Sequence, residues 1–252
     1  MDIKYIVKDY FSSKNFQEFI NRRFRDDSYV VVKKEGVKYI SYGEGLHLSP
    51  KSFTIHGRVE SMILDNPYHV ENIYPNDVVI DVGSNIGGFT LLAATRTKNK
   101  IVSVEPLSVL YDALVESISL NGMEKQIIPL KKALGSGGKI YVSWGEGGYA
   151  ETVTLSELLE MAGGRCDFLK MNCEGGEWDG ILQCDKLDKI GRVAMYYHCY
   201  TEKDDVNLLV RKFKDCGFDV KIAPIDDWKP ILKEDPKHIG MIHCTRGDWK
   251  HS

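Results

Sequence analysis

Long hydrophobic runs and a strong net charge are both missing from this sequence. No stretch of its 252 residues approaches the roughly 20 apolar residues that a membrane-spanning helix needs. The first ten residues include four charged side chains where a secretory signal would be apolar, so we expect a cytoplasmic protein. The net charge of −3 gives no broad basic surface, which argues against nucleic acid as a partner.

The cysteines also lack the close spacing, such as Cys-x-x-Cys, that is typical of zinc sites and redox motifs. We therefore predict reduced and mostly buried thiols, with no metal site and no disulfide framework. The six cysteines are Cys166, Cys173, Cys184, Cys199, Cys216 and Cys244. A hydrophobic fraction of 43% and a length of 252 residues suit one globular core with a small extension.

The most informative stretch combines a strand, a glycine-rich turn and the start of a helix. Residues 78–82 are apolar except for Asp81 and predict a buried strand, and residues 91–94 predict a helix. Such a turn lies at the carboxyl edge of a parallel sheet, where α/β folds bind nucleotide-like ligands. The ligand-binding residues predicted here are Asp81, Gly83, Ser84, Asn85 and Gly87.

Spacing separates the ligands that this turn could bind. A dinucleotide fingerprint needs glycine where Asn85 stands, and a phosphate-binding P-loop needs lysine where Phe89 stands. The remaining pattern, Asp-x-Gly-x-x-x-Gly from Asp81 to Gly87, resembles the first motif of Rossmann-like methyltransferases that bind S-adenosylmethionine. A purely structural turn is the alternative.

A carboxylate follows the next predicted strand. The apolar residues 101–104 end at Glu105, which lies 24 residues after Asp81. An acid at the tip of the second strand is where the ribose hydroxyls of a nucleoside bind. We therefore predict that Glu105 binds ribose, with a solvated loop acid as the alternative.

Strands and helices alternate from residue 74 onward, which is the βαβ pattern of a parallel sheet. Strands are predicted at residues 127–130, 168–171, 193–197, 218–223 and 239–244, helices at 108–121 and 203–216, and a β-leaning insertion at 135–149. A capping box at residues 154–157 predicts the start of a further helix.

The N-terminal region is predicted to pack on this main domain. It contains an expected helix at residues 14–26, a hairpin formed by residues 29–33 and 37–42, and irregular chain at residues 46–55. Residues 1–66 are too few to hold a core of their own, so we predict a helix and hairpin extension there. Residues 67–252 form the predicted main domain.

Three separate segments resemble the FkbM-type methyltransferases. Residues 167–178 are similar to the signature Lys-x-Asp-x-Glu-Gly-x-Glu, and residues 131–135 and 153–159 match the family's Ala-Leu-Gly and Thr-Leu-x-x-Leu-Leu segments. The resemblance implies a Rossmann-like class I fold, with a mostly parallel seven-stranded sheet and helices on both faces. It also implies S-adenosylmethionine as cofactor, O-methylation of a hydroxyl, and cofactor contacts by Ala133 and Asn172.

Two positions depart from the family pattern, because Asn172 replaces an aspartate and Tyr196 replaces the acid of a Glu-x-His motif. Glu174 and His198, at the ends of neighbouring predicted strands, are the candidate catalytic bases. The alternatives are an acid that favours a helix N-terminus and a core histidine. We predict a small molecule, sugar or glycan as substrate, with a non-catalytic cofactor-binding protein and an RNA methyltransferase as alternatives. Oligomeric state is not predicted.

Overall fold

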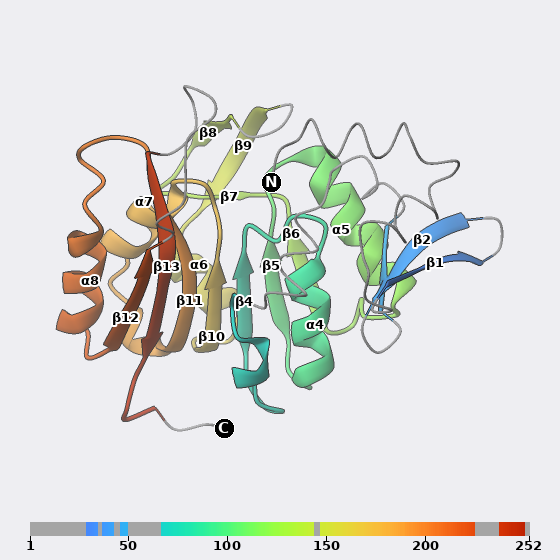
Figure 1. Cartoon of the computed structure of the whole chain (residues 1–252), viewed down its shortest axis with the longest axis horizontal. Coiled ribbons are helices and arrows are strands. Elements are labelled where there is room, and N and C mark those ends of the chain that lie inside the picture. Colours follow the sequence, from blue (N-terminus) through green and yellow to red (C-terminus); the bar gives the residue numbers. More distant parts are fainter. Residues whose placement is uncertain are drawn as a thin grey trace.

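The molecule is organised around a seven-stranded sheet with the strand order β12-β13-β11-β10-β4-β5-β6 (Figure 1). The computed structural model describes residues 29–34, 37–42, 46–49, 67–143, 147–224 and 237–249. The strands are β4 (Val79–Val82), β5 (Ile101–Val104), β6 (Ile127–Leu130), β10 (Cys166–Met171), β11 (Ile190–Cys199), β12 (Asp219–Pro224) and β13 (His238–Thr245). Within this sheet only β13 is antiparallel to its neighbours, so the predicted mostly parallel sheet is confirmed.

Helices cover both faces of the sheet, as predicted. One face packs against α4 (Gly88–Arg96) and α5 (Ser108–Leu120). The other packs against α6 (Leu155–Met161), α7 (Gly176–Leu182) and α8 (Val206–Asp215). Two short 3-10 helices, η2 and η3, complete the helical segments of the part that the structure describes. They span Val70–Asn72 and Leu187–Lys189.

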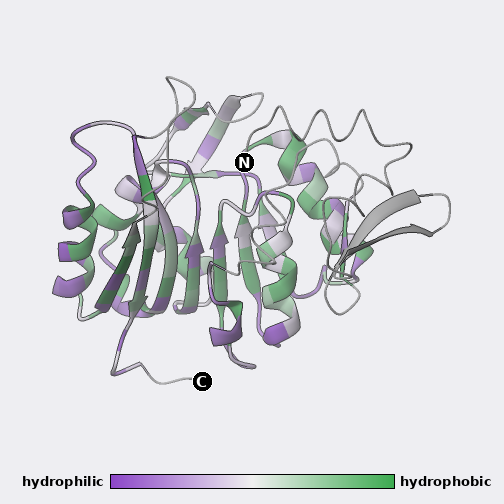
Figure 2. Ribbon diagram, viewed as in Figure 1, coloured by the Kyte–Doolittle hydropathy of each residue, from purple (hydrophilic) through white to green (hydrophobic). Residues whose placement is uncertain are grey.

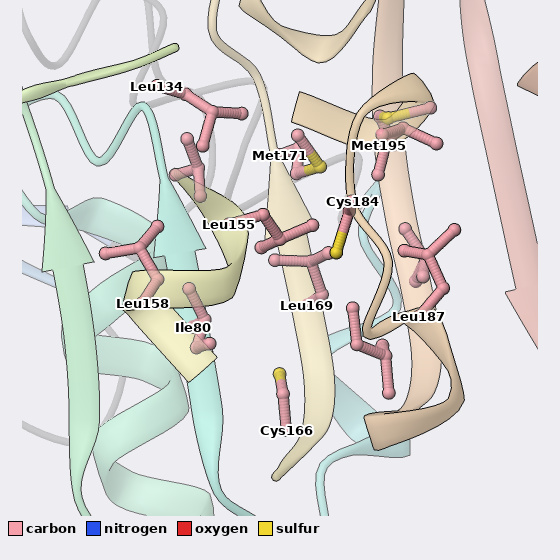
Figure 3. Packing of buried hydrophobic residues seen from close by; sticks show 14 of the residues in the cluster. Ile80, Leu134, Leu155, Leu158, Cys166, Leu169, Met171, Cys184, Leu187 and Met195 are labelled. Atoms are coloured by element: carbon pink, nitrogen blue, oxygen red, sulfur yellow. The ribbon is translucent and has the colours of Figure 1, made fainter. Parts of the chain in front are cut away.

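Side chains that alternate along each strand fill two hydrophobic clusters, one on each face. Val79 belongs to the cluster beneath α4 and α5, and its neighbour Ile80 belongs to the cluster beneath α6, α7 and α8. Figure 3 shows Leu155 and Leu158 of α6 lying beside Ile80 and Leu169. Strands covered on both faces need apolar residues at nearly every position, which explains the short apolar runs, such as residues 101–104, in the sequence.

Local capping fixes where two of the helices begin. Thr154 and Glu157 form the predicted capping box of α6, in which each side chain accepts the backbone N–H of the other residue. Such a cap contributes about 1 kcal/mol to stability. The helix α8 begins at Val206, later than predicted, because Asp205 caps it by accepting the N–H of Asn207. Figure 2 shows both hydrophilic and hydrophobic residues along α8, as expected of a helix with one exposed face.

A second, three-stranded sheet with the order β7-β9-β8 occupies the predicted insertion. It comprises β7 (Ala133–Leu134), β8 (Lys139–Val142) and β9 (Gly148–Val153). In Figure 1 this sheet lies beyond the carboxyl ends of β4 and β5. Tyr149 is 79% exposed and its ring meets that of Tyr141 edge-on, with 5.2 Å between centroids.

The N-terminal hairpin is confirmed, since β1 (Tyr29–Lys34) and β2 (Val37–Tyr42) pair antiparallel. The irregular chain expected after it is partly wrong, because β3 (Leu46–Leu48) extends the hairpin into a third strand. Both leucines of β3 are buried in the cluster with α4 and α5. The N–H of His47 donates to Oδ1 of Asn121 at 2.8 Å. Tertiary contacts therefore stabilise a strand that the local sequence only weakly favours.

The rest of the extension stays a prediction. The expected helix at residues 14–26 lies outside the described residues, and nothing in the structure tests the division at residue 66. Among the helices that the structure describes, none has the length and apolar character to cross a membrane.

Candidate active site

The glycine turn after β4 is in direct backbone contact with the end of β10. Gly83 has a φ of +74°, and a Cβ at this position would lie 1.8 Å from the carbonyl oxygen of Asn172. Gly87 precedes α4 with a φ of +97°, and a Cβ there would lie 2.9 Å from Cδ1 of Leu114. Both positions therefore require glycine, because a side chain has neither the conformation nor the space.

Asp81 lies beneath this turn with its side chain fully buried. One carboxylate oxygen is 2.9 Å from Nζ of Lys170, and the other accepts the hydroxyl of Thr90 at 2.5 Å. Lys170 also donates to the carbonyl oxygen of Gly83 at 2.7 Å. The buried ion pair therefore supports the turn from within the core. Direct contact of Asp81 with a cofactor stays a prediction.

Ser84 and Asn85 shape the turn through short-range hydrogen bonds. The hydroxyl of Ser84 donates to the carbonyl oxygens of Asp81 and Val104, at 3.0 and 3.1 Å. Asn85 has a φ of +54°, and its Oδ1 accepts the N–H of Ile86 at 2.8 Å. Asparagine tolerates this left-handed conformation better than most residues, which explains why it is accommodated at this position of the turn.

Glu105 follows β5 and connects it to the turn. Its Oε2 accepts the N–H of Asn85 at 2.9 Å, and its Oε1 accepts the N–H of Leu107 at 3.0 Å. Glu105 is only 4% exposed, and this burial raises the pKa of its carboxyl to about 7, although the two backbone hydrogen bonds oppose the effect. Each carboxylate oxygen has further lone-pair positions, so Glu105 retains the capacity to accept ligand hydroxyls.

Ala133 and Asn172, the two residues that the family resemblance added, lie on neighbouring segments of this edge. Ala133 is buried on β7, where it pairs with Thr152 of β9. Asn172 donates its backbone N–H to the carbonyl oxygen of Val82 at 2.9 Å, which extends the β10 to β4 pairing by one residue. Its Oδ1 is buried and has no hydrogen-bond partner within the described residues. A buried acceptor of this kind suits a ligand that donates a hydrogen bond.

Glu174 and His198, the predicted bases, are brought together by the fold. Oε2 of Glu174 lies 3.7 Å from Nε2 of His198 and accepts the hydroxyl of Tyr200 at 3.0 Å. Glu174 has a φ of +50°, a strained conformation for a residue other than glycine. The Glu174 side chain is 26% exposed, whereas that of His198 is 7% exposed. Strain of this kind persists where surrounding contacts enforce it, as they often do in active sites.

Glu177 completes a row of acid, imidazole and acid. Its side chain is fully buried in the first turn of α7, where Oε1 accepts the backbone N–H of His198 at 2.7 Å and lies 2.9 Å from Nδ1 of the same ring. Its Oε2 accepts the N–H of Gly175 at 2.9 Å. The described residues contain no group of three or more His, Cys, Asp or Glu side chains that could hold a metal ion.

A family model described as a methyltransferase FkbM domain matches residues 81–220. The chain belongs to this family. The match begins at Asp81, covers more than half of the 252 residues, and includes the glycine turn, Glu105 and the loop after β10. Membership confirms the resemblance found in the sequence and implies S-adenosylmethionine as the methyl donor.

Similarity to individual methyltransferases is partial. Methyltransferase sdnD of Sordaria araneosa is 31% identical over 78 residues, which cover 31% of this chain and 30% of that protein. The solved structure of Trm5b from Pyrococcus abyssi is 11% identical with a TM-score of 0.48, over 86% of this chain and 56% of that one. Precorrin-6y C5,15-methyltransferase from Geobacter metallireducens is 12% identical with a TM-score of 0.48, over 73% and 88% of the two chains. Likenesses this distant carry no argument about substrate.

The two residues that depart from the FkbM pattern, Asn172 and Tyr196, both contact Tyr68. Nδ2 of Asn172 donates to the Tyr68 hydroxyl at 3.1 Å, and the ring of Tyr196 packs edge-on against Tyr68 at 5.7 Å. Burial raises the pKa of Tyr68 well above its ordinary value, and the nearby Tyr196 adds to the effect. A hydroxyl that stays protonated is compatible with either an amide or a carboxylate at position 172.

The sequence did not predict the contacts of three residues in this candidate site, Glu177, Tyr68 and Tyr200. Glu177 is the last acid of the family signature, but its position also fits an ordinary acid in the first turn of a helix, and the sequence alone does not separate the two roles. Tyr68 lies 104 residues from its partner Asn172, so no local pattern could reveal it. Tyr200 lies just beyond β11 and was not singled out.

Proposed function

We propose that this chain transfers a methyl group from S-adenosylmethionine to a hydroxyl oxygen of a small molecule, sugar or glycan. The observation that best supports this proposal is the 3.7 Å distance between Glu174, in the loop that begins at Asn172 beside the glycine turn, and His198 of β11. A hydroxyl must lose its proton as it attacks, and a well-placed base contributes about 10²–10⁴-fold to the rate. An acid and an imidazole at the ligand-binding edge are therefore suited to O-methylation.

The bound cofactor would supply the methyl group on a sulfonium. Glu105 would accept hydrogen bonds from the ribose hydroxyls. Oδ1 of Asn172, which has no hydrogen-bond partner within the described residues, would accept an N–H or O–H of the ligand. Ala133 would offer apolar surface. The glycines of the turn let its backbone approach Asn172 and Leu114 closely, which holds the turn at this edge of the sheet. Residues assigned to the turn part of the site are Asp81, Gly83, Ser84, Asn85 and Gly87.

The loop after β10 favours a hydroxyl over an amine as the acceptor. Amino-group methyltransferases hold the target nitrogen with an Asn/Asp-Pro-Pro-aromatic segment at this place, whereas here Cys173, Glu174 and Gly175 follow Asn172. A carboxylate and an imidazole remove protons, which a hydroxyl acceptor requires. The net charge of −3 gives no support to RNA as the substrate.

A non-catalytic protein that binds S-adenosylmethionine is the second candidate. The observation that favours it is the loss of two acids from the family pattern, at Asn172 and Tyr196. Against it stands the row of Glu174, His198 and Glu177, which supplies a base that cofactor binding alone does not require.

Two measurements test the proposed function. Calorimetry should detect binding of S-adenosylmethionine and of S-adenosylhomocysteine, and a methyl-labelled donor should give transfer to oxygen within a panel of alcohols, sugars and glycans. Binding without transfer, unrelieved by Asn172→Asp combined with Tyr196→Glu, would favour the non-catalytic candidate. Transfer to an amine or to a tRNA transcript would contradict hydroxyl methylation.

A further inference from the structure

We infer that Glu177 is a positioning residue that makes Nε2 of His198, and not Glu174, the base for the acceptor hydroxyl. This inference rests on the proposed hydroxyl methylation and names the atom that receives the proton. It follows from a difference between the two acids, since Glu177 binds Nδ1 of the ring whereas Glu174 lies near Nε2.

The contacts of Glu177 fix the tautomer of the ring. Both of its oxygens face N–H donors, with Gly175 on Oε2 and the backbone of His198 on Oε1, which is the arrangement expected of an acceptor-only carboxylate. Nδ1 of His198 lies 2.9 Å from the same Oε1, so Nδ1 must carry the hydrogen of that bond. In a neutral imidazole the other nitrogen then holds the lone pair. Nε2 is therefore the proton acceptor of the ring.

Glu174 is less suited to take the proton. Its Oε2 already accepts the hydroxyl of Tyr200 at 3.0 Å, so part of its capacity to accept a proton is occupied. At 3.7 Å it lies beyond hydrogen-bonding distance of Nε2 but close enough to stabilise positive charge there. Glu174 therefore stabilises the imidazolium form of His198, whereas Glu177 orients the neutral imidazole.

The proposed transfer step moves a methyl group to the acceptor oxygen, a proton to His198 and an electron pair to sulfur. As the acceptor oxygen forms its bond to the methyl carbon, its proton passes to Nε2 of His198, and the pair from the broken carbon–sulfur bond stays on sulfur. The resulting imidazolium lies between Glu177 and Glu174 and returns its proton to water after the product leaves. The rings of Tyr196 and Tyr200 also lie near it, at 6.3 and 6.4 Å between centroids, and the thiol of Cys173 donates to Oε2 of Glu177 at 3.5 Å.

The tautomer can be read by NMR without any substrate. Protein labelled with ¹⁵N in its histidines should give long-range ¹H–¹⁵N spectra in which neutral His198 carries its hydrogen on Nδ1. His198→Gln identifies its signals among the seven histidines of the chain. Glu177→Gln should shift the ring toward a mixture of tautomers. Asp179→Asn removes one charge from the same helix, where the side chain of Asp179 contacts Gln183, and should leave the tautomer unchanged.

Turnover separates the two acids once an acceptor is known. Glu177→Gln and His198→Gln should each lower kcat by about 10²–10⁴-fold with little change in cofactor affinity, because the first removes the group that orients the base and the second removes the base itself. Glu174→Gln should lower kcat by about tenfold or less and keep the Nδ1 tautomer, because it removes only a neighbouring charge.

Two results would overturn the inference. One is a wild-type neutral His198 with its hydrogen on Nε2. The other is a loss of kcat that is larger in Glu174→Gln than in His198→Gln. The proposed function fails separately, by absence of cofactor binding in calorimetry, whatever the tautomer proves to be.

Discussion

The two halves of the site are built in different ways. The half that includes the glycine turn and Glu105 comes from 25 consecutive residues and depends on backbone conformation, with glycines at φ of +74° and +97°. The half that includes Glu174, Glu177 and His198 joins separate segments through side-chain hydrogen bonds. We therefore expect the first half, the proposed binding half, to be sensitive to added atoms, and the second half, the proposed catalytic half, to be sensitive to lost charges and hydrogen-bond donors.

The largest expected effect comes from the buried ion pair beneath the turn. Lys170→Met leaves Asp81 charged in a site where both side chains are fully buried, and such a change costs about 3–5 kcal/mol of unfolding free energy. Urea unfolding measures it, and Lys170→Met combined with Asp81→Asn should recover part of the loss. Lys186→Met, which breaks the exposed pair with Glu160, should leave stability nearly unchanged. Equal losses in the two single variants would contradict the supporting role of Lys170.

Gly83→Ala should have the next largest effect, because it adds an atom where the two halves touch. A positive φ at a residue other than glycine costs about 1–3 kcal/mol, and the new Cβ must also displace the carbonyl oxygen of Asn172. We expect lower stability together with an affinity for S-adenosylhomocysteine that is at least tenfold weaker by calorimetry. Gly122→Ala is the matched control, since its φ is +65° but a Cβ there meets nothing within 4 Å. It should keep full affinity.

Removal of Glu105, the proposed ribose acceptor, tests the binding half alone. Charge-assisted hydrogen bonds contribute roughly 1.5–3 kcal/mol, so Glu105→Ala should weaken cofactor binding by about ten- to a hundredfold. The tautomer of His198 should not change, because no described contact joins Glu105 to that ring. Glu124→Ala, at an exposed position, serves as the control. An unchanged dissociation constant would place the ribose elsewhere.

The pH dependence of binding should follow the same carboxyl. Burial raises the pKa of Glu105 to about 7, so the group is largely protonated at pH 6 and ionised at pH 8. Ligand hydroxyls donate to the ionised form and lower this pKa on binding, so protons are released and affinity rises with pH by up to about tenfold, then levels above pH 7. Calorimetry in buffers of different ionisation enthalpy detects the protons. Glu105→Gln should abolish the dependence, and an affinity that falls with pH would refute it.

The smallest effect is expected at the departure from the family pattern. Asn172→Asp should preserve or raise turnover, because the Tyr68 hydroxyl that now accepts from the amide can instead donate to a carboxylate. Steady-state kinetics with a labelled methyl donor measures it. A loss greater than tenfold would mean that the amide donor itself is needed at this position.

Local pattern explains which parts of the fold and site were predictable. The strands, the capping box at Thr154 and the turn from Asp81 to Gly87 depend on short-range periodicity and backbone conformation, which a sequence displays directly. The strand β3 was not expected, because burial of its leucines against α5 decides its conformation. The contact of Tyr68 with Asn172 and that of Glu177 with the His198 ring were not expected either, since each depends on segments that only the fold brings together.

The contact between Gly83 and Asn172 has a consequence for how such a site can diversify. The two loops leave adjacent parallel strands, and such strands lie about 4.8 Å apart because their main chains are hydrogen-bonded. The spacing between these two loops is therefore set by the hydrogen-bond ladder of the sheet rather than by any side chain. On the proposed function, side chains that select the acceptor can change around the two loops without altering the spacing between them.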